Sequence, residues 1–129
     1  MSQNETSLPR KLLIVDDSKV SRMRIRAFFT AHCPSWELQE ASSGDEALNM
    51  AAGDKPDFVT MDVNMPGMSG FETAQLMLAR DGDIRIVMLT ANIQDSSRQV
   101  AASLRLNFVA KPATEASLQQ ALDHLVGTA

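Results

Sequence analysis

The sequence predicts an α/β protein with a doubly wound (βα)5 fold, in which helices cover both faces of one five-stranded parallel sheet. One pattern in the sequence and one general rule of topology predict this class. Short apolar runs alternate along the chain with segments that carry apolar residues at helical spacing. Strands that alternate with helices in this order pair in parallel through right-handed crossovers, which place helices on both faces of the sheet.

The first strand and the first helix are predicted in the first quarter of the chain. Residues 12–15 form a continuous apolar run, which we expect to be a strand buried on both faces. Ser18 is a favourable N-cap for the helix that follows, and Pro34 cannot continue that helix. Positions i, i+3, i+7 and i+8 share one helix face, which predicts a buried stripe of Val20, Met23, Ala27 and Phe28.

The second strand is predicted over residues 36–41, where Trp36 and Leu38 alternate with polar side chains. Glu40 falls on the apolar side of this alternation. A charged residue there is more compatible with an edge strand than with a central strand. A short turn then leads into a helix over residues 45–52.

The other elements follow the same alternation of strand and helix. Strands are expected at 58–61, 84–89 and 108–110. Helices are expected at 71–80, at 94–104 and after Thr114, which can cap the last one.

Length and composition limit the number of domains. The chain has 129 residues, of which 44% are hydrophobic, and this fits one domain with its own core. We expect residues 11–127 to form that domain after a flexible segment over residues 1–10. The same arithmetic leaves no room for a separate effector domain.

The cysteine count and the N-terminus predict a cytoplasmic protein. There is one cysteine, Cys33, so no intrachain disulfide forms, as is usual in a reducing compartment. Residues 1–10 are polar and unlike a signal peptide, and no apolar window approaches the ~20 residues needed to span a bilayer.

Charge is distributed unevenly along the chain. There are 12 basic and 16 acidic residues, a net charge of −4 that argues against direct nucleic-acid binding. Half of the basic residues lie in the first fifth of the chain, as a solvated helix face or a docking face for an acidic partner. They are Arg10, Lys11, Lys19, Arg22, Arg24 and Arg26.

Polar side chains stand where the predicted strands end. Asp16 and Asp17 follow the first strand, Asp62 ends the third, Thr90 closes the fourth and Lys111 follows the fifth. Ligands of open parallel sheets bind at the carboxyl ends of the strands. Three carboxylates at one edge repel one another, and a hard divalent cation such as Mg²⁺ (or Mn²⁺) relieves that repulsion.

This set of side chains suits phosphoryl transfer to an aspartate. Asp62 has the chemistry of a nucleophile that forms an aspartyl-phosphate. Phosphoryl transfer requires in-line positioning and neutralisation of the phosphoryl oxygens. We expect Mg²⁺ on Asp17 and Asp62 to neutralise one oxygen, with Asp16 holding metal-bound water. Lys111 and the Thr90 hydroxyl would each hold another oxygen.

Four segments carry a resemblance to a known family. They are LIVDDS at 13–18, PDFVTMDVNMPGMSG at 56–70, VMLTA at 87–91 and FVAKP at 108–112. With them the sequence resembles the receiver domain of two-component response regulators, which has a flavodoxin-like fold. It is most similar to the chemotaxis-type, single-domain kind. The resemblance runs from about residue 12 to residue 126, nearly the whole chain.

The resemblance implies a signalling phosphoacceptor rather than an enzyme with a separate substrate. Asp62 would accept a phosphoryl group from a phosphohistidine on a sensor kinase or a phosphotransfer protein. Its only catalysis would be its own phosphorylation and slow autodephosphorylation. The family's Mg²⁺ ligands correspond to Asp16, Asp17, Asp62 and the main-chain carbonyl of Asn64.

The resemblance also implies a switch and two docking faces. Thr90 moves toward the phosphoryl group, and an aromatic residue, here Phe108 in place of the common tyrosine, turns inward. Helix 94–104, strand 108–110 and the last helix then bind a downstream protein target, while the first helix often meets the phosphodonor. Asn64 and Asn92 stand where members tune dephosphorylation, and the Lys111–Pro112 bond is typically cis.

The sequence alone leaves alternatives to a single-domain regulator open. The chain fits equally a receiver cut from a larger regulator with an effector domain. A haloacid-dehalogenase-type phosphatase also uses a strand-end aspartate with Mg²⁺, but needs an acid where this chain has Asn64. A flavodoxin-like flavin binder would need a phosphate-cradling loop where Asp16 and Asp17 stand. The kinase and the target, whether a flagellar motor protein, a relay kinase or a phosphodiesterase, are also open.

Overall fold

The computed structural model describes residues 8–91 and 106–127, and its centre is one parallel sheet of five strands. The strand order is β2-β1-β3-β4-β5, so β2 and β5 are the edges. This confirms the predicted α/β class, the parallel sheet and the edge position of the second strand. The strands are β1 (Lys11–Val15), β2 (Glu37–Ala41), β3 (Phe58–Asp62), β4 (Arg85–Thr90) and β5 (Asn107–Ala110).

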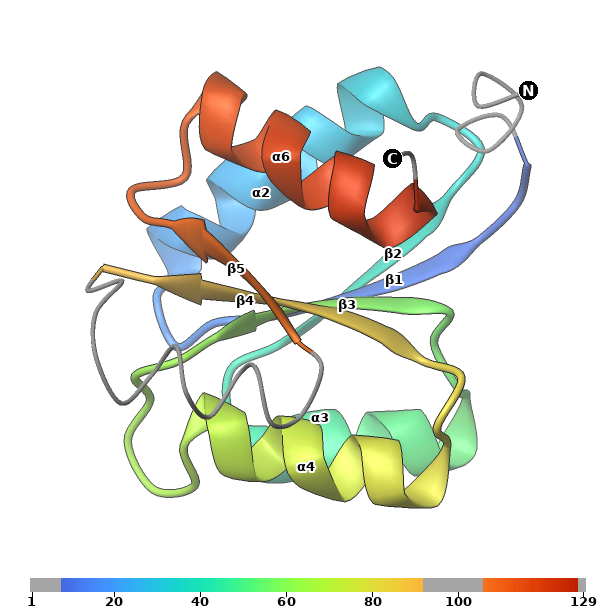
Figure 1. The fold of residues 1–129 in the computed structure, drawn as a ribbon, viewed down its shortest axis with the longest axis vertical. Coiled ribbons are helices and arrows are strands. Elements are labelled where there is room, and N and C mark those ends of the chain that lie inside the picture. The colour runs from blue at the N-terminus through green and yellow to red at the C-terminus, as the bar shows by residue number, and fades with distance from the viewer. Residues whose placement is uncertain (1–7, 92–105, 128–129) are drawn as a thin grey trace.

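Helices cover both faces of the sheet, as Figure 1 shows. The helices α2 (Lys19–His32) and α6 (Glu115–Val126) lie on one face. The helices α3 (Gly44–Gly53) and α4 (Gly70–Arg80) lie on the other face. The predicted helix over 94–104 lies outside the described residues, as do residues 1–7 of the predicted flexible segment.

The two faces of the sheet carry separate apolar cores because successive strand residues point to opposite sides. In β1, Leu12 and Ile14 pack into the core under α2 and α6, and Leu13 and Val15 pack into the other core. Every residue of β3 is buried. The central strands are therefore held on both sides, which fixes where each of them ends.

Side-chain caps set the start of each helix. The N-cap residues are Ser18, Ser43, Ser69 and Thr114, and each accepts a hydrogen bond from the backbone N–H three residues later. Such caps satisfy one of the donors left free at a helix N-terminus. Ser18 and Thr114 were predicted as caps, and both predictions are confirmed.

The predicted buried stripe of α2 is wrong for three of its four residues. Val20 is 60% exposed and Met23 57% exposed, and Ala27 is also exposed. The buried face instead carries Ile25, Phe28 and Phe29. Two apolar stripes of helical period exist on this helix, and the one with two phenylalanines buries more area.

Aromatic packing explains this choice of face. The ring of Phe29 stacks on that of Trp36 with ring centroids 5.7 Å apart. The centroids of the Trp36 and Phe58 rings are 5.0 Å apart. Trp36 lies just before β2 rather than inside it. The helix is thus rotated so that its largest side chains meet the aromatic residues of neighbouring elements.

Within the part of the chain that the structure describes, no helix combines the length and the apolar character required to cross a membrane.

Gly70 is predicted to be essential for stability because α4 starts against the end of β3. A Cβ at Gly70 would lie 2.0 Å from the main-chain oxygen of Asp62, whereas a Cβ at Gly53 meets nothing within 4 Å. We expect Gly70→Ala to lower the free energy of unfolding by about 2 kcal/mol or more. Gly53→Ala should leave it unchanged or raise it by about 0.5 kcal/mol. Urea denaturation of both variants checks this, and equal stabilities would contradict the close approach.

Candidate functional site: an acidic cluster at the carboxyl edge of the sheet

The strand register brings the predicted site residues to one edge. Asp62 pairs with Leu89, so Thr90 lies one residue beyond this pair on β4. Thr90 in turn pairs with Ala110, the last residue of β5, and Lys111 is the next residue after that strand. Asp16 follows β1, whose last residue pairs with Met61. The parallel sheet therefore gathers residues that lie up to 95 positions apart in the chain.

Three carboxylates form a cluster at this edge. Asp16, Asp17 and Asp62 each contribute one oxygen, and these three atoms lie within 4.8 Å of one another. Asp16 is fully buried and Asp62 is 5% exposed, while Asp17 is exposed. Carboxylate oxygens in this arrangement are the ligands that Mg²⁺ prefers. The donor set therefore fits a hard divalent cation.

Lys111 supplies the nearest positive charge. Its Nζ lies 3.0 Å from Asp16 Oδ2 and 3.3 Å from Asp62 Oδ1. Its main-chain N–H donates to the Thr90 carbonyl at 2.8 Å, and the Lys111–Pro112 bond is cis, as the resemblance implied. The sequence predicted that Lys111 and Asp62 lie at the same edge of the sheet. The structure adds the contacts with both Asp62 and Asp16, so one ammonium bridges the two buried carboxylates.

The environment of Asp62 disfavours its charged form. Burial, followed by the negative charge of Asp16, raises the pKa of Asp62 to about 6, although Lys111 acts in the opposite direction. For Lys111, burial lowers the pKa, but the hydrogen bond with Asp16 and the charge of Asp62 outweigh it and raise the pKa above its ordinary value. The lysine therefore stays charged, while Asp62 has more negative charge around it than one ammonium balances.

The polar atoms of Asp16 are held by donors that the sequence argument missed. Its Oδ1 accepts from the Ser18 N–H at 2.9 Å, and its Oδ2 accepts from the Ser21 hydroxyl at 2.6 Å. Its carbonyl oxygen accepts from Arg22 Nη1 at 2.7 Å. Ser21 and Arg22 lie in the first turn of α2, which runs away from the site. Ser21 and Arg22 follow Asp16 by only five and six residues, and this short spacing is the feature of the sequence that could have predicted the contacts.

The other predicted residues lie around the cluster at different depths. Thr90 is 1% exposed at the end of β4. Asn64 is exposed in the loop after β3. Phe108 is half-buried, and its ring meets Phe71 edge to face with centroids 5.9 Å apart. Asn92 lies outside the described residues.

Comparison with known proteins identifies the family. The family model described as the response regulator receiver domain matches residues 12–123. A protein-glutamate methylesterase/protein-glutamine glutaminase of Geobacillus kaustophilus is 35% identical over 122 residues, which are 91% of this chain and 35% of that protein. Protein CcdB of Bacillus subtilis is 30% identical over 120 residues, which are 91% of this chain and 98% of that protein.

A solved structure agrees with these sequence matches. The CheX–CheY–BeF3–Mg²⁺ complex from Borrelia burgdorferi superposes with a TM-score of 0.83 at 25% identity, covering 93% of this chain and 91% of that one. The chain belongs to the response regulator receiver domains of two-component systems. It spans about a third of the length of the first curated relatives that it matches.

Asp62 is predicted to destabilise the metal-free protein at neutral pH. The folded state binds its proton with a pKa of about 6, against about 4 in an unfolded chain. Stability should therefore fall as pH rises from about 4 to about 6, because only the folded state binds this proton in that range. We expect Asp62→Asn to raise the free energy of unfolding at pH 7, without divalent metal, by about 1–3 kcal/mol.

Paired denaturation curves at pH 3.5 and pH 7 measure this effect. The gain from Asp62→Asn should disappear at the lower pH, where a protonated aspartate and an asparagine are nearly equivalent. The same gain at both pH values would show that the charge of Asp62 is not its cause.

Proposed function

We propose that the protein is a phosphoacceptor response regulator, in which Asp62 receives a phosphoryl group from a phosphohistidine of a kinase or phosphotransfer protein. The single observation that carries this proposal is the strand-end cluster, where the Asp62 carboxylate lies 3.3 Å from Lys111 Nζ and beside two further carboxylates. The receiver family supports the same assignment. The reaction modifies the protein itself, so we do not propose an enzyme with a separate substrate.

The proposed step is a direct transfer between two side chains. An oxygen of Asp62 attacks phosphorus, the new P–O bond forms, and the P–N bond to the histidine breaks. The imidazole leaves with the electron pair of that bond and takes a proton from solvent. Lys111, already in contact with Asp62, would hold one phosphoryl oxygen, and the Thr90 hydroxyl would hold another.

The cofactor that we propose is Mg²⁺ (or Mn²⁺). Asp16, Asp17, Asp62 and the main-chain carbonyl of Asn64 would hold it, directly or through water. When bound, the ion supplies positive charge to a phosphoryl oxygen. The proximity of the three carboxylates supports this ligand set, as does the relative from Borrelia burgdorferi, whose structure is described with BeF3 and Mg²⁺.

The proposed output is contact with a downstream protein through β5, α6 and the predicted helix over residues 94–104. Phe108 and Thr90 would be the switch residues, and Asn64 and Asn92 would tune dephosphorylation. Phe108 has no hydroxyl, so packing alone would hold its inward position; in the structure its ring meets Phe71 edge to face. We propose neither nucleic-acid binding nor membrane insertion, and a cytoplasmic location.

The phosphodonor would dock on the exposed side of α2. Val20 and Met23 present apolar surface there, on the helix that follows Asp16 and Asp17. Lys19 and Arg24 are also exposed on α2 and form no hydrogen bond or ion pair with the described residues. Apolar and basic side chains together suit an acidic helical surface that presents a phosphohistidine.

The proposed domain arrangement is a receiver over residues 11–127 with a preceding segment over 1–10. A second role is that of the receiver part of a longer regulator with an effector domain, which the greater length of the first relatives supports. Both roles require the same chemistry at Asp62, so the tests below apply to either.

Incubation with acetyl phosphate and Mg²⁺ is expected to add one phosphoryl group to the protein. Intact-mass spectrometry measures the gain, which EDTA should abolish because the cluster then lacks its cation. Asp62→Asn is the matched control, since it keeps the size of the side chain and removes the nucleophile. Equal labelling of wild type and Asp62→Asn would refute the assignment of Asp62.

Met23→Glu is expected to slow phosphotransfer from a phosphorylated histidine phosphotransfer domain by about tenfold, a loss of about 1.4 kcal/mol of docking energy. Labelling by acetyl phosphate should not change, because a small donor needs no docking surface. Leu76→Glu is the control, since Leu76 is a similarly exposed apolar residue on α4 (44%), on the opposite face of the sheet. Equal slowing by both variants would contradict docking on α2.

A further inference from the structure

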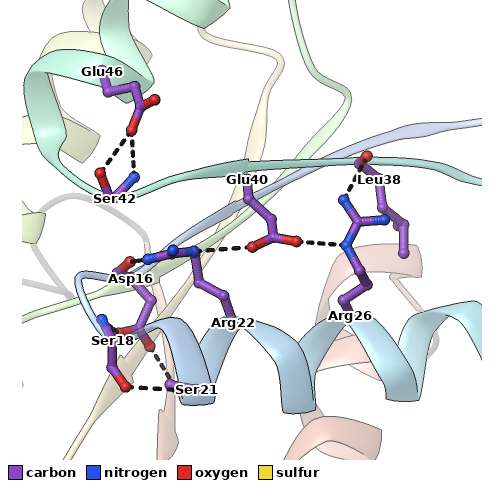
Figure 2. Close-up of polar contacts among 9 residues, drawn as sticks. All are labelled: Asp16, Ser18, Ser21, Arg22, Arg26, Leu38, Glu40, Ser42 and Glu46. Atoms are coloured by element: carbon purple, nitrogen blue, oxygen red, sulfur yellow. Dashed lines mark hydrogen bonds and ion pairs between the residues drawn. The ribbon is translucent and has the colours of Figure 1, made fainter.

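Arg22 connects the acidic cluster to the edge strand of the sheet. Figure 2 shows its guanidinium between Asp16 and Glu40. Its Nη1 donates to the Asp16 carbonyl oxygen at 2.7 Å, and its Nε donates to Glu40 Oε1 at 2.9 Å. The side chain of Arg22 is only 16% exposed. One arginine therefore links β1, α2 and β2 at the base of the cluster.

Glu40 is held between two arginines of the same helix. Its other oxygen, Oε2, accepts from Arg26 Nε, and Arg26 Nη2 donates to the Leu38 carbonyl at 3.2 Å. This explains why a glutamate stands on the inward side of β2. It also divides the basic run of the sequence, because Arg22 and Arg26 face β2 while Lys19 and Arg24 remain exposed.

The contact with the Asp16 carbonyl constrains more than Asp16. That carbonyl belongs to the rigid, planar peptide unit that also contains the N–H of Asp17. The N–H of Asp16 donates to the Ala41 carbonyl at 3.1 Å, so β2 fixes one side of the residue and Arg22 fixes the other. Asp17 is exposed, and the direction in which it leaves the backbone depends on this peptide plane.

We propose that Arg22, anchored by Glu40, is a positioning residue that fixes the Asp16–Asp17 peptide so that both carboxylates converge with Asp62 on one cation. The inference rests on the proposed function, because it assigns Arg22 a role in that same site. Arg22 itself would touch neither the cation nor the phosphoryl group. Residues that orient metal ligands in this way commonly contribute 10- to 100-fold to metal affinity.

The positive charge of Arg22 allows a measurement of Mg²⁺ affinity to distinguish a positioning role from a purely electrostatic one. Loss of a positive charge near three carboxylates should, by Coulomb attraction alone, make Mg²⁺ bind more tightly. Loss of a positioning contact should make Mg²⁺ bind more weakly. The two explanations therefore predict opposite signs for the change in dissociation constant.

Isothermal titration of Mg²⁺ into Arg22→Met and Arg26→Met is the experiment. Arg26 is the matched control, because it lies on the same helix and binds the same glutamate but does not reach Asp16. We expect Arg22→Met to raise the Mg²⁺ dissociation constant by about tenfold. We expect Arg26→Met to leave it within about twofold. Circular dichroism and thermal melts establish that each variant is folded.

A purely structural role would lower the melting temperature of Arg22→Met and leave the Mg²⁺ affinity of the folded protein intact, and that result would overturn the proposal. Tighter Mg²⁺ binding by Arg22→Met would overturn it as well. If Arg22→Met does not fold, Arg22→Lys decides, because it keeps the charge but not the planar fork that spans two acceptors. It should weaken Mg²⁺ binding by about threefold, and unchanged affinity would refute the role.

The proposed function can fail separately. Wild-type protein that binds Mg²⁺ but gains no phosphoryl group from acetyl phosphate would contradict the phosphoacceptor role. It would leave the positioning role of Arg22 to be judged by Mg²⁺ affinity alone.

Discussion

The burial of two carboxylates at one edge of the sheet is the constraint on which the rest of the site depends. Buried charges are costly unless they are paired and hydrogen-bonded. Asp16 meets this requirement, since Lys111, Ser18 and Ser21 all donate to its carboxylate. Asp62 shares the same ammonium and remains short of positive charge, which its raised pKa reflects. That deficit suits a nucleophile whose charge is balanced only when a cation is bound.

The succession of strands along the chain and the residues that end them were predictable from the sequence, whereas the order of the strands across the sheet was not, apart from the edge position of the second strand. Apolar runs mark buried strands, and in a parallel sheet all carboxyl ends meet at one edge. The sequence therefore predicts that Asp62, Thr90 and Lys111 lie together. The buried face of α2 was not predictable in this way, because its two apolar stripes have the same period. Contacts of Phe29 with Trp36, which helical spacing does not encode, select one of them.

The sequence carried two unexplained features, an inward glutamate on the second strand and a basic first helix, and tertiary structure joins them. Glu40 binds Arg22 and Arg26, so part of the basic run is structural and part remains exposed. The exposed part shares α2 with the stripe that was predicted to be buried. Val20 and Met23, which were predicted to be buried, are thus part of the proposed docking surface. Ser21 and Arg22 of this helix donate hydrogen bonds to Asp16. Val20 and Met23 of the same helix are exposed, where a partner could contact them.

The central claim is that Asp16, Asp17 and Asp62 form one cation site at the edge of the sheet. Titration of Mg²⁺ into ¹³C-labelled protein, followed through the side-chain carboxyl resonances, tests it most directly. The account predicts one saturable binding event that shifts the resonances of these three aspartates and leaves distant acids such as Asp83 and Glu115 unchanged. Shifts spread over the surface carboxylates, or no saturation, would contradict it.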